Sequence, residues 1–298
     1  MAGLFELEPM IPETAFRNAV VEMLRRAETT LPKDVLLALK KANRNERNSI
    51  AKFHYKMMFK NLQLAKRLGV PICQDTGVFT FFMKLGRDLK LPFDPEMVIA
   101  EAVKIATQEV PLRANVVDPL TRKPLPSNTG RLQPSVHLEL MSGNGLELEL
   151  LVKGAGTENC SRLFMMRPTE GVETIEKIVL KTVEEAGGKS CPPNIVGIGI
   201  GGSMETAALM AKRALLRPMN KRNPDSELAE LEHRIELAAN ELKIGPMGLG
   251  GKTTVLGVHI EKAACHTASL PVAVALQCWP ARRAKAIKVA DELKVVEP

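Results

Sequence analysis

The chain has 298 residues, of which 45% are hydrophobic and 25% charged, so it can bury a sizeable core. Its formal net charge of +7 attracts anions in general, from nucleic acids to small dianionic substrates. Because only 4% of the residues are aromatic, a stacking platform for single-stranded nucleic acid is disfavoured. No apolar run approaches the ~20 residues that span a bilayer. We therefore expect no nucleic-acid partner and no membrane partner.

The N-terminus, MAGLFELEPMIPETAF, carries acids and prolines where a signal peptide needs positive charge and an apolar core. This composition predicts a cytoplasmic protein. In a reducing compartment the five cysteines are thiols, metal ligands or nucleophiles rather than disulfides. The densest group of basic residues is interpreted as part of a solvated surface of mixed charge: Arg282, Arg283, Lys285 and Lys288.

The first part of the chain has a helical pattern from residue 12 to about 68, interrupted at Leu31-Pro32 and ended by Gly69-Val70-Pro71. A polar turn, Cys73 to Gly77, leads into a strand-like run at 78–85. Asp94-Pro95 is typical of a helix start, and that helix is expected to extend to about residue 108. Residues 111–134 contain five prolines without periodicity, which predicts a long loop of the kind that is often functional.

Two alternating runs, 136–140 and 146–150, flank Ser142-Gly143-Asn144-Gly145 and predict a β-hairpin. A glycine-rich loop at 154–156 is expected before Cys160. The remaining expected elements are helices at about 170–186, 204–216 and from 226, and strands at 194–200, 254–260 and, last, 270–277. This order predicts the α+β class, with a helical N-terminal region followed by a mixed β-sheet with packed helices.

Two glycine motifs resemble nucleotide-binding signatures but lack their context. Gly197, Gly199 and Gly202 fit G-x-G-x-x-G, yet a helix follows where a second strand ending in an acid is required. The favoured interpretation is close packing of a helix on a strand. Gly251-Lys252-Thr253 resembles the end of a P-loop, but Pro246 occupies the position of the first glycine and a strand-like run follows.

The cysteines Cys73, Cys191 and Cys278 each lie in a turn at the end of a strand, where a ligand can project into a cleft. Cys160 and Cys265 also lie in predicted loops, so position alone does not separate the five. No C-x-x-C pair is present, which disfavours a zinc ribbon or a thioredoxin-type site.

Five segments resemble class I, iron–sulfur fumarate hydratases and the alpha subunit of L-tartrate dehydratase, in the right order over residues 15 to 290. They are Cys73-Gln-Asp-Thr-Gly77, Ser190-Cys-Pro-Pro193, Asn223-Pro224-Asp225, Gly245-Pro-Met-Gly-Leu-Gly-Gly-Lys-Thr253, and the stretch from Leu270 to Cys278-Trp279.

This resemblance implies that Cys73, Cys191 and Cys278 hold a four-iron four-sulfur cluster, while Cys160 and Cys265 are ordinary thiols. Three thiolates leave one iron without a protein ligand, and that iron can act as a Lewis acid on a substrate hydroxyl. The resemblance also assigns further site residues by position. Substrate binding falls to Gln74, Arg113 and Gly156, and catalysis to Asp75 and His266.

Single-chain members of the family carry a further C-terminal domain. We therefore expect residues 1–298 to form one hydro-lyase alpha-subunit domain that needs a separate beta subunit, in a heterotetramer or similar assembly. Residues 117–123 and 156–159 favour fumarate and malate as substrates. Residues 204–208 and Cys278-Trp279 resemble tartrate dehydratase more closely. Fumarate hydration is the first expectation, L-tartrate dehydration the alternative, and a non-catalytic iron–sulfur regulatory subunit the remote one.

Overall fold

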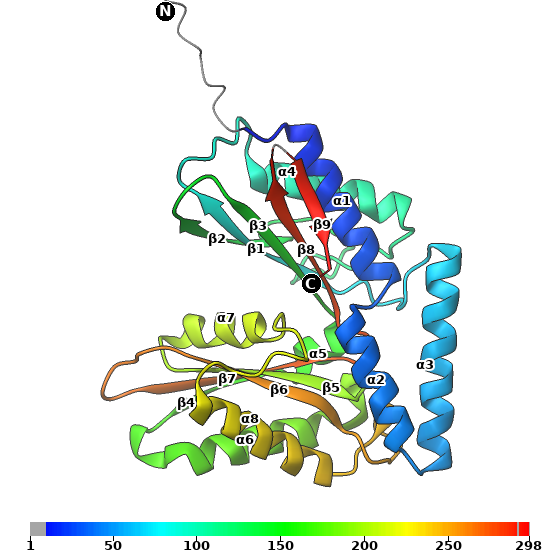
Figure 1. The fold of residues 1–298 in the computed structure, drawn as a ribbon, viewed down its shortest axis with the longest axis vertical. Coiled ribbons are helices and arrows are strands. Elements are labelled where there is room, and N and C mark those ends of the chain that lie inside the picture. The colour runs from blue at the N-terminus through cyan, green and yellow to red at the C-terminus, as the bar shows by residue number, and fades with distance from the viewer. Residues whose placement is uncertain (1–9, 291, 298) are drawn as a thin grey trace, which may run out of the picture. The chain divides into compact units, whose positions relative to one another are not determined.

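The computed structural model describes residues 10–290 and 292–297. The chain divides into two compact units, visible in Figure 1. Unit 1 comprises Met1–Thr30, Ala65–Val152 and Arg282–Pro298, and unit 2 comprises Leu31–Leu64 and Lys153–Ala281. Residues 1–9 lie outside the described residues. They form most of the N-terminal segment that was predicted not to be a signal peptide. That one functional domain spans 1–298 stays a prediction.

Unit 1 is a five-stranded sheet of order β2-β1-β3-β8-β9 that shares its core with two helices. The helices α1 (Glu13–Thr29) and α4 (Pro95–Glu109) pack against each other, as Figure 1 shows. Alternate residues of β1 and β3 face them, so Phe79 and Phe81 join Leu148 and Leu150 in one apolar cluster. The strands are β1 (Val78–Gly86), β2 (Ser135–Met141), β3 (Leu146–Lys153), β8 (Arg282–Val289) and β9 (Glu292–Val296).

The predicted hairpin between residues 136 and 150 is wrong, because β1 lies between β2 and β3. β2 pairs with β1 in parallel, with Thr80 opposite Ser135. The end of β1 enters the expected turn, where the Gly86 amide donates to the Gly145 carbonyl at 2.8 Å. A Cβ on Gly86 would meet the Gly143 oxygen at 2.2 Å, so only glycine fits there. Local turn chemistry cannot reveal that a distant segment inserts.

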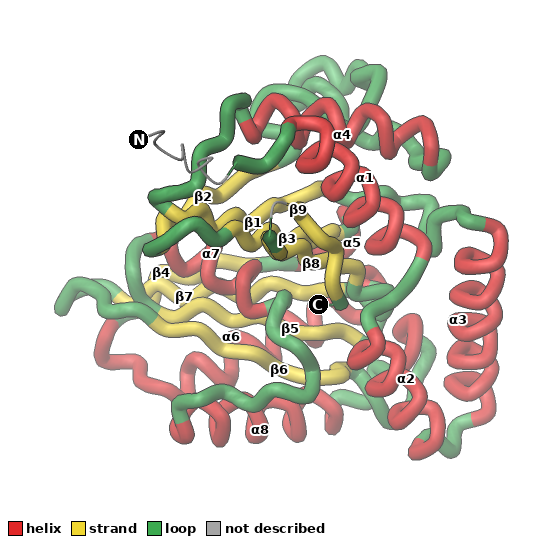
Figure 2. Tube along the Cα trace, turned by 45° about the horizontal axis from the view of Figure 1, so that its top comes forward, coloured by secondary structure: helices red, strands yellow, loops and turns green. Residues whose placement is uncertain are grey.

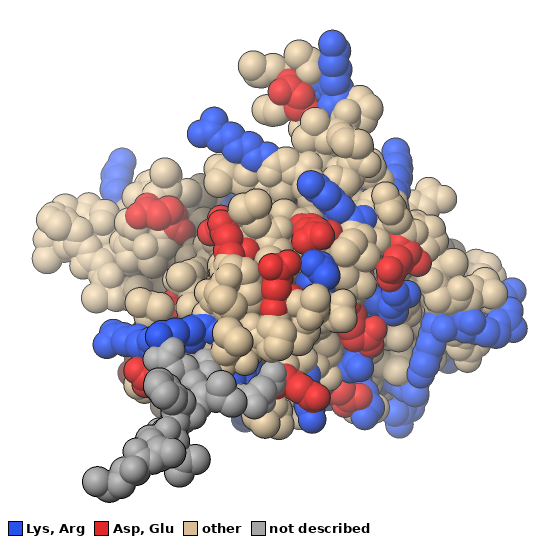
Figure 3. Space-filling model, turned by 90° about the horizontal axis from the view of Figure 1, so that it is seen from above, with Lys and Arg blue, Asp and Glu red and all other residues tan. Residues whose placement is uncertain are grey.

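The expectation that 270–277 is the last strand is also wrong, since β8 and β9 follow it and pair antiparallel. Arg282 and Arg283, expected on a solvated surface, are 1% and 3% exposed on β8. Arg282 forms a buried ion pair with Glu28 of α1, at 2.5 Å. Elsewhere the charges are interspersed, as the face of the molecule in Figure 3 shows, with Lys and Arg beside Asp and Glu.

Unit 2 contains a four-stranded sheet of order β4-β7-β5-β6, with α7 on one face and α6 and α8 on the other (Figures 1 and 2). β5 pairs in parallel with β6 and antiparallel with β7, so the sheet is mixed and the predicted α+β class is confirmed. The strands are β4 (Arg162–Met166), β5 (Asn194–Ile200), β6 (Val255–Lys262) and β7 (Leu270–Gln277). The helices are α2 (Lys33–Asn45), α3 (Ser49–Leu68), α5 (Ala155–Cys160), α6 (Gly171–Ala186), α7 (Met204–Ala214) and α8 (Ser226–Glu241), with 3-10 turns η1 (Pro168–Glu170), η2 (Gly187–Ser190) and η3 (Pro246–Gly248).

The glycines of the G-x-G-x-x-G pattern pack a helix on a strand, as predicted. Added Cβ atoms on Gly197 and Gly199 would meet the carbonyl oxygens of Ala211 and Ala207 on α7 at 2.2 and 2.1 Å. Gly251-Lys252-Thr253 leads into strand β6, which confirms that it is not a P-loop. The glycine-rich loop expected at 154–156 is instead the start of α5.

No helix within the described ranges combines the length and the apolar character needed to cross a membrane.

Candidate functional site

Unit 2 brings Cys191 and Cys278 to the same edge of its sheet. β5 and β7 are antiparallel with Ile195 opposite Gln277, so the start of β5 meets the end of β7. The Trp279 amide donates to the Cys191 carbonyl at 3.0 Å. Cys278 is buried and Cys191 is half-buried. We call this edge, residues 190–194 with 277–279, the cysteine edge.

One buried amide side chain, Asn194, fixes both cysteine-bearing segments. Its Nδ2 donates to the carbonyls of Ser190 at 2.9 Å and of Gln277 at 3.1 Å. These carbonyls belong to the residues immediately before Cys191 and Cys278. Its Oδ1 accepts from the Ser190 hydroxyl at 2.8 Å. Asn194 belongs to none of the sequence motifs; its one signal in the sequence is that of a polar residue at the start of an otherwise apolar strand.

Glycine motifs support the loop that carries Cys191. A Cβ on Gly156 would meet the Lys189 oxygen at 2.6 Å, so this glycine lets α5 approach η2. A Cβ on Gly248 would meet Gly188 Cα at 2.4 Å. The Met247 amide donates to the Pro192 carbonyl at 2.8 Å. The segment from Gly245 to Thr253 therefore packs against the loop that carries Cys191. Gly156 has a packing role that is independent of any ligand.

Unit 1 gathers Asp75 and the segment of Arg113. Asp75 Oδ1 accepts from the Gly77 amide at 2.9 Å and from Asn115 Nδ2 at 3.2 Å. The buried Thr76 hydroxyl donates to the Arg113 carbonyl at 2.8 Å. Gln74 and Arg113 are exposed, while Cys73 and Asp75 are half-buried. The turn Cys73–Gly77 and the first residues of the long loop thus form one local polar surface.

The backbone of a buried residue, Glu28, supports this turn from within unit 1. The Glu28 carbonyl accepts from the Ile72 amide at 2.8 Å, next to Cys73. Burial raises the pKa of the Glu28 carboxyl from 4.5 to about 7, because it outweighs the opposing effect of Arg282, and the charge of Asp75 adds to the rise. The negative charge of Asp75 therefore disfavours ionisation of Glu28 in the buried pair with Arg282.

His266 lies at the other end of the unit 2 sheet. It precedes β7 whereas Cys278 follows it, and at ~3.4 Å per residue the strand separates the two by about 25 Å. His266 is exposed, and its Nδ1 accepts from the Ala268 amide at 3.1 Å. Within unit 2 the structure does not bring His266 to the cysteine edge.

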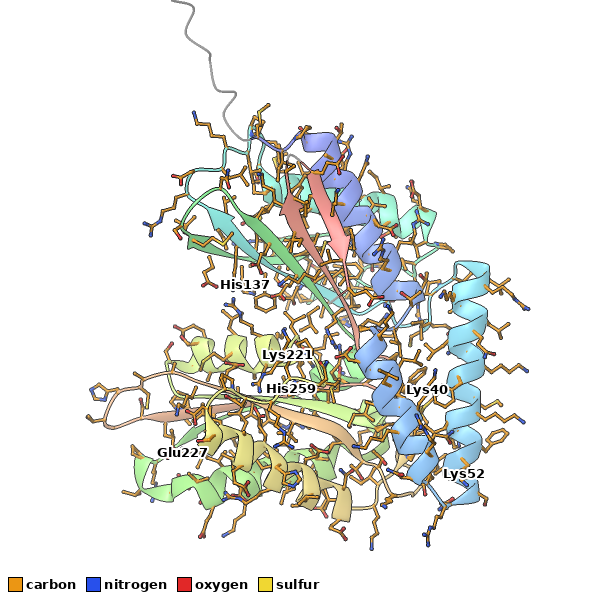
Figure 4. All side chains as sticks on the ribbon, viewed as in Figure 1. Lys40, Lys52, His137, Lys221, Glu227 and His259 are labelled. Atoms are coloured by element: carbon orange, nitrogen blue, oxygen red, sulfur yellow. The ribbon has the colours of Figure 1, made fainter. Side chains whose placement is uncertain are left out.

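Two other thiols and a second histidine lie apart from this arrangement. Cys265 is exposed beside His266, and Cys160 is buried as the last residue of α5. His259, labelled in Figure 4, is buried on β6 with Nδ1 3.1 Å from the Ala214 carbonyl oxygen. His259 is accounted for by packing.

The profile of the family described as fumarate hydratase (fumerase) matches residues 17–287. This chain belongs to that family. The resemblance seen in the five sequence segments is thereby confirmed, and with it membership of a group of hydro-lyases that includes fumarate hydratases and tartrate dehydratase alpha subunits.

Curated relatives of this fumarate hydratase family member are named for tartrate. A protein of Methanocaldococcus jannaschii named "Putative L(+)-tartrate dehydratase subunit alpha" is 46% identical over 281 residues, covering 93% of this chain and 99% of that protein. The L(+)-tartrate dehydratase subunit alpha of Escherichia coli O157:H7 is 39% identical over 264 residues, covering 88% and 87%. The K12 strain protein of the same name gives the same identity and coverage.

For a family member, the thiols of the cysteine edge suit an iron–sulfur cluster, since soft thiolates are the donors such clusters take. The two sulfurs belong to adjacent strand ends that one side chain, Asn194, ties together. Among residues 10–290 and 292–297, no three His, Cys, Asp or Glu side chains gather into a group that could hold a metal ion. Cys73, the third ligand that the resemblance predicts, belongs to unit 1.

Proposed function

We propose that this chain is the alpha subunit of an iron–sulfur hydro-lyase that dehydrates L(+)-tartrate. The observation that carries the proposal is that Cys191 and Cys278 lie at one edge of the sheet, where Asn194 hydrogen-bonds to the residue before each of them. The names of the relatives from M. jannaschii and E. coli support the substrate. On this basis tartrate replaces fumarate as the first choice.

In this proposal Cys73, Cys191 and Cys278 are the protein ligands of a four-iron four-sulfur cluster. When bound, the cluster supplies a Lewis acid that helps the substrate hydroxyl leave. The chain's own contribution at the cysteine edge is to hold two thiol groups in a partly buried place, which limits access of water.

The substrate groups come from the polar surface of unit 1. Arg113 offers a planar fork of N–H donors that suits a carboxylate, and Gln74 beside Asp75 adds hydrogen-bonding capacity. The Gly77 amide and Asn115 orient the Asp75 carboxyl, which we assign to proton transfer. Gly156 completes the proposed substrate-binding set through its place beside η2. His266 is included on the resemblance alone, because within unit 2 it lies at the far end of β7 from the cysteine edge.

Hydration of fumarate is the second candidate. It is favoured by the description of the matching family and by residues 117–123 and 156–159. In either case the subunit names of the relatives support a separate beta subunit that completes the site.

The test is an anaerobic assay of the chain co-expressed with its beta subunit. We expect kcat/KM for L(+)-tartrate to exceed that for fumarate and malate, and little turnover by the alpha chain alone. A clear preference for fumarate would assign the second function. Full activity of the single chain would contradict the two-subunit assignment. Absence of turnover of all three acids by the iron-loaded complex would contradict the assignment as a hydro-lyase.

A further inference from the structure

A lysine that the family assignment did not single out is buried near the cysteine edge. Lys153, the last residue of β3, has a side chain only 1% exposed. Its Nζ lies 2.9 Å from the Ser161 hydroxyl oxygen and 2.7 Å from Glu158 Oε2. Burying an ammonium group is costly unless it is paired, and the ion pair with Glu158 offsets that cost.

Ser161 connects this lysine to the strand that ends at Cys278. The Ser161 Oγ accepts from Lys153 and from the amide of Leu276, the latter at 3.3 Å, and donates to the Thr157 carbonyl. Leu276 lies two residues before Cys278 on β7. The hydrogen bonds from Lys153 to Ser161 and from Leu276 to Ser161 therefore place the ammonium group beside the end of β7 that carries Cys278.

The lysine's partner does not cancel the local positive charge. Glu158 is shared with a second lysine, Lys212, whose Nζ lies 2.9 Å from Oε1. Burial would raise the pKa of Glu158, but the charges of Lys153 and Lys212 outweigh it and hold the pKa below its usual value. Two cations therefore surround one carboxylate, leaving about one net positive charge in this group of three side chains.

We propose that Lys153 is a positioning residue that provides a fixed positive charge near the end of β7 that carries Cys278 and offsets the negative charge of a thiolate-ligated cluster. This inference rests on the proposed function. The reduction potential of such a cluster depends on the net charge around it. A buried cation acts strongly because its field is little screened by solvent. Removing it should make the reduced cluster less favourable.

The experiment uses the anaerobically reconstituted alpha–beta complex and measures cluster content and reduction potential. We expect Lys153→Met to move the potential to more negative values, by the equivalent of about a tenfold change in the oxidised-to-reduced equilibrium. Lys153→Arg should stay near wild type because it keeps the charge. Glu158→Gln should move the potential in the opposite direction, since it removes a negative charge from the same group.

Lys212→Met is the matched control, because Lys212 contacts the same carboxylate but is 29% exposed. Its shift should be smaller than that of Lys153→Met. Unshifted potentials in both Lys153→Met and Glu158→Gln, or shifts of the same sign, would overturn this inference alone. If Lys153→Met does not fold, the Glu158→Gln and Lys153→Arg results decide the question. A wild-type complex without iron would overturn the proposed function and this inference with it.

Discussion

The two ends of the unit 2 sheet are built differently. At the cysteine edge, the buried side chain of Asn194 binds both cysteine-bearing segments, and glycines pack the neighbouring turns tightly. At the opposite end, Cys265 and His266 lie in an exposed turn whose contacts include the hydrogen bond from the Ala268 amide to His266. Buried polar groups must be satisfied and so fix geometry, whereas an exposed turn does not require it. The geometry of the cysteine edge is therefore fixed by internal hydrogen bonds and close packing, as the proposed cluster ligation requires.

The largest expected effect separates the thiols of the two ends. Replacing Cys191 or Cys278 with Ser should abolish cluster binding and activity, because a hydroxyl is a poor substitute for a thiolate ligand. Cys265→Ser, at the other end, and Cys160→Ser, inside α5, should leave both largely intact. Anaerobic absorption and electron paramagnetic resonance spectra of the four variants provide the measurement. Retention of the cluster in Cys278→Ser would contradict the assignment of Cys278 as a cluster ligand.

His266→Ala sharpens the comparison from the exposed end. If the imidazole transfers a proton, kcat should fall by about a hundredfold or more. Iron content and the free energy of unfolding should not change, because the side chain is exposed and far along the strand from the cysteine edge. Activity assays with iron analysis on the same preparation check this. Unaltered kcat would remove His266 from the catalytic set.

Asn194→Ala tests the buried network directly. It leaves the Ser190 and Gln277 carbonyls without their partner, so the free energy of unfolding should fall by about 1–3 kcal/mol. Cluster retention should fall as well, since both cysteine segments lose their link. Asn240→Ala is the control, because Asn240 also joins backbone groups, the amides of Thr254 and Val255, away from the cysteines. Equal iron loss in both variants would contradict a specific role for Asn194.

The effect with the least bearing on this comparison concerns Glu28, which lies in unit 1 and outside the unit 2 sheet. Its pKa of about 7 in the folded state lies above the ordinary 4.5, so the folded chain binds more protons between these values. Stability should therefore fall as the pH rises through this window, and Glu28→Gln should reduce the fall by on the order of 2 kcal/mol. Denaturant unfolding at pH 5 and pH 7.5 measures it, with Glu22→Gln on the same helix as control. An equal loss of unfolding free energy between pH 5 and pH 7.5 in wild type and Glu28→Gln would refute the raised pKa of Glu28.

Local periodicity predicted most helices and strands of this chain, because their apolar stripes and end signals are encoded within each segment. Asp94, for example, caps α4 by accepting from the Glu96 amide at 2.9 Å. Non-local pairing defeated the same approach. β1 inserts between β2 and β3. The basic residues Arg282 and Arg283 are buried at the start of β8. The partner Glu28 lies 254 positions earlier, so no local pattern could show that Arg282 is neutralised.

The candidate site follows the same division. The turn positions of Cys191 and Cys278 at strand ends could be read from the sequence, and the resemblance selected them among the five thiols. Their placement at one edge depends on the antiparallel pairing of β5 and β7, which the sequence analysis did not predict. The supporting residues Asn194 and Lys153 were missed for the same reason, since each acts through contacts between separate segments.

The most direct test of the central claim is the metal and sulfide content of the wild-type chain, purified anaerobically with its beta subunit. We expect about four irons and four sulfides per alpha chain, with a spectrum that changes when L(+)-tartrate is added because one iron lacks a protein ligand. Stoichiometric zinc, or a chain that takes up no iron under reconstitution, would contradict it.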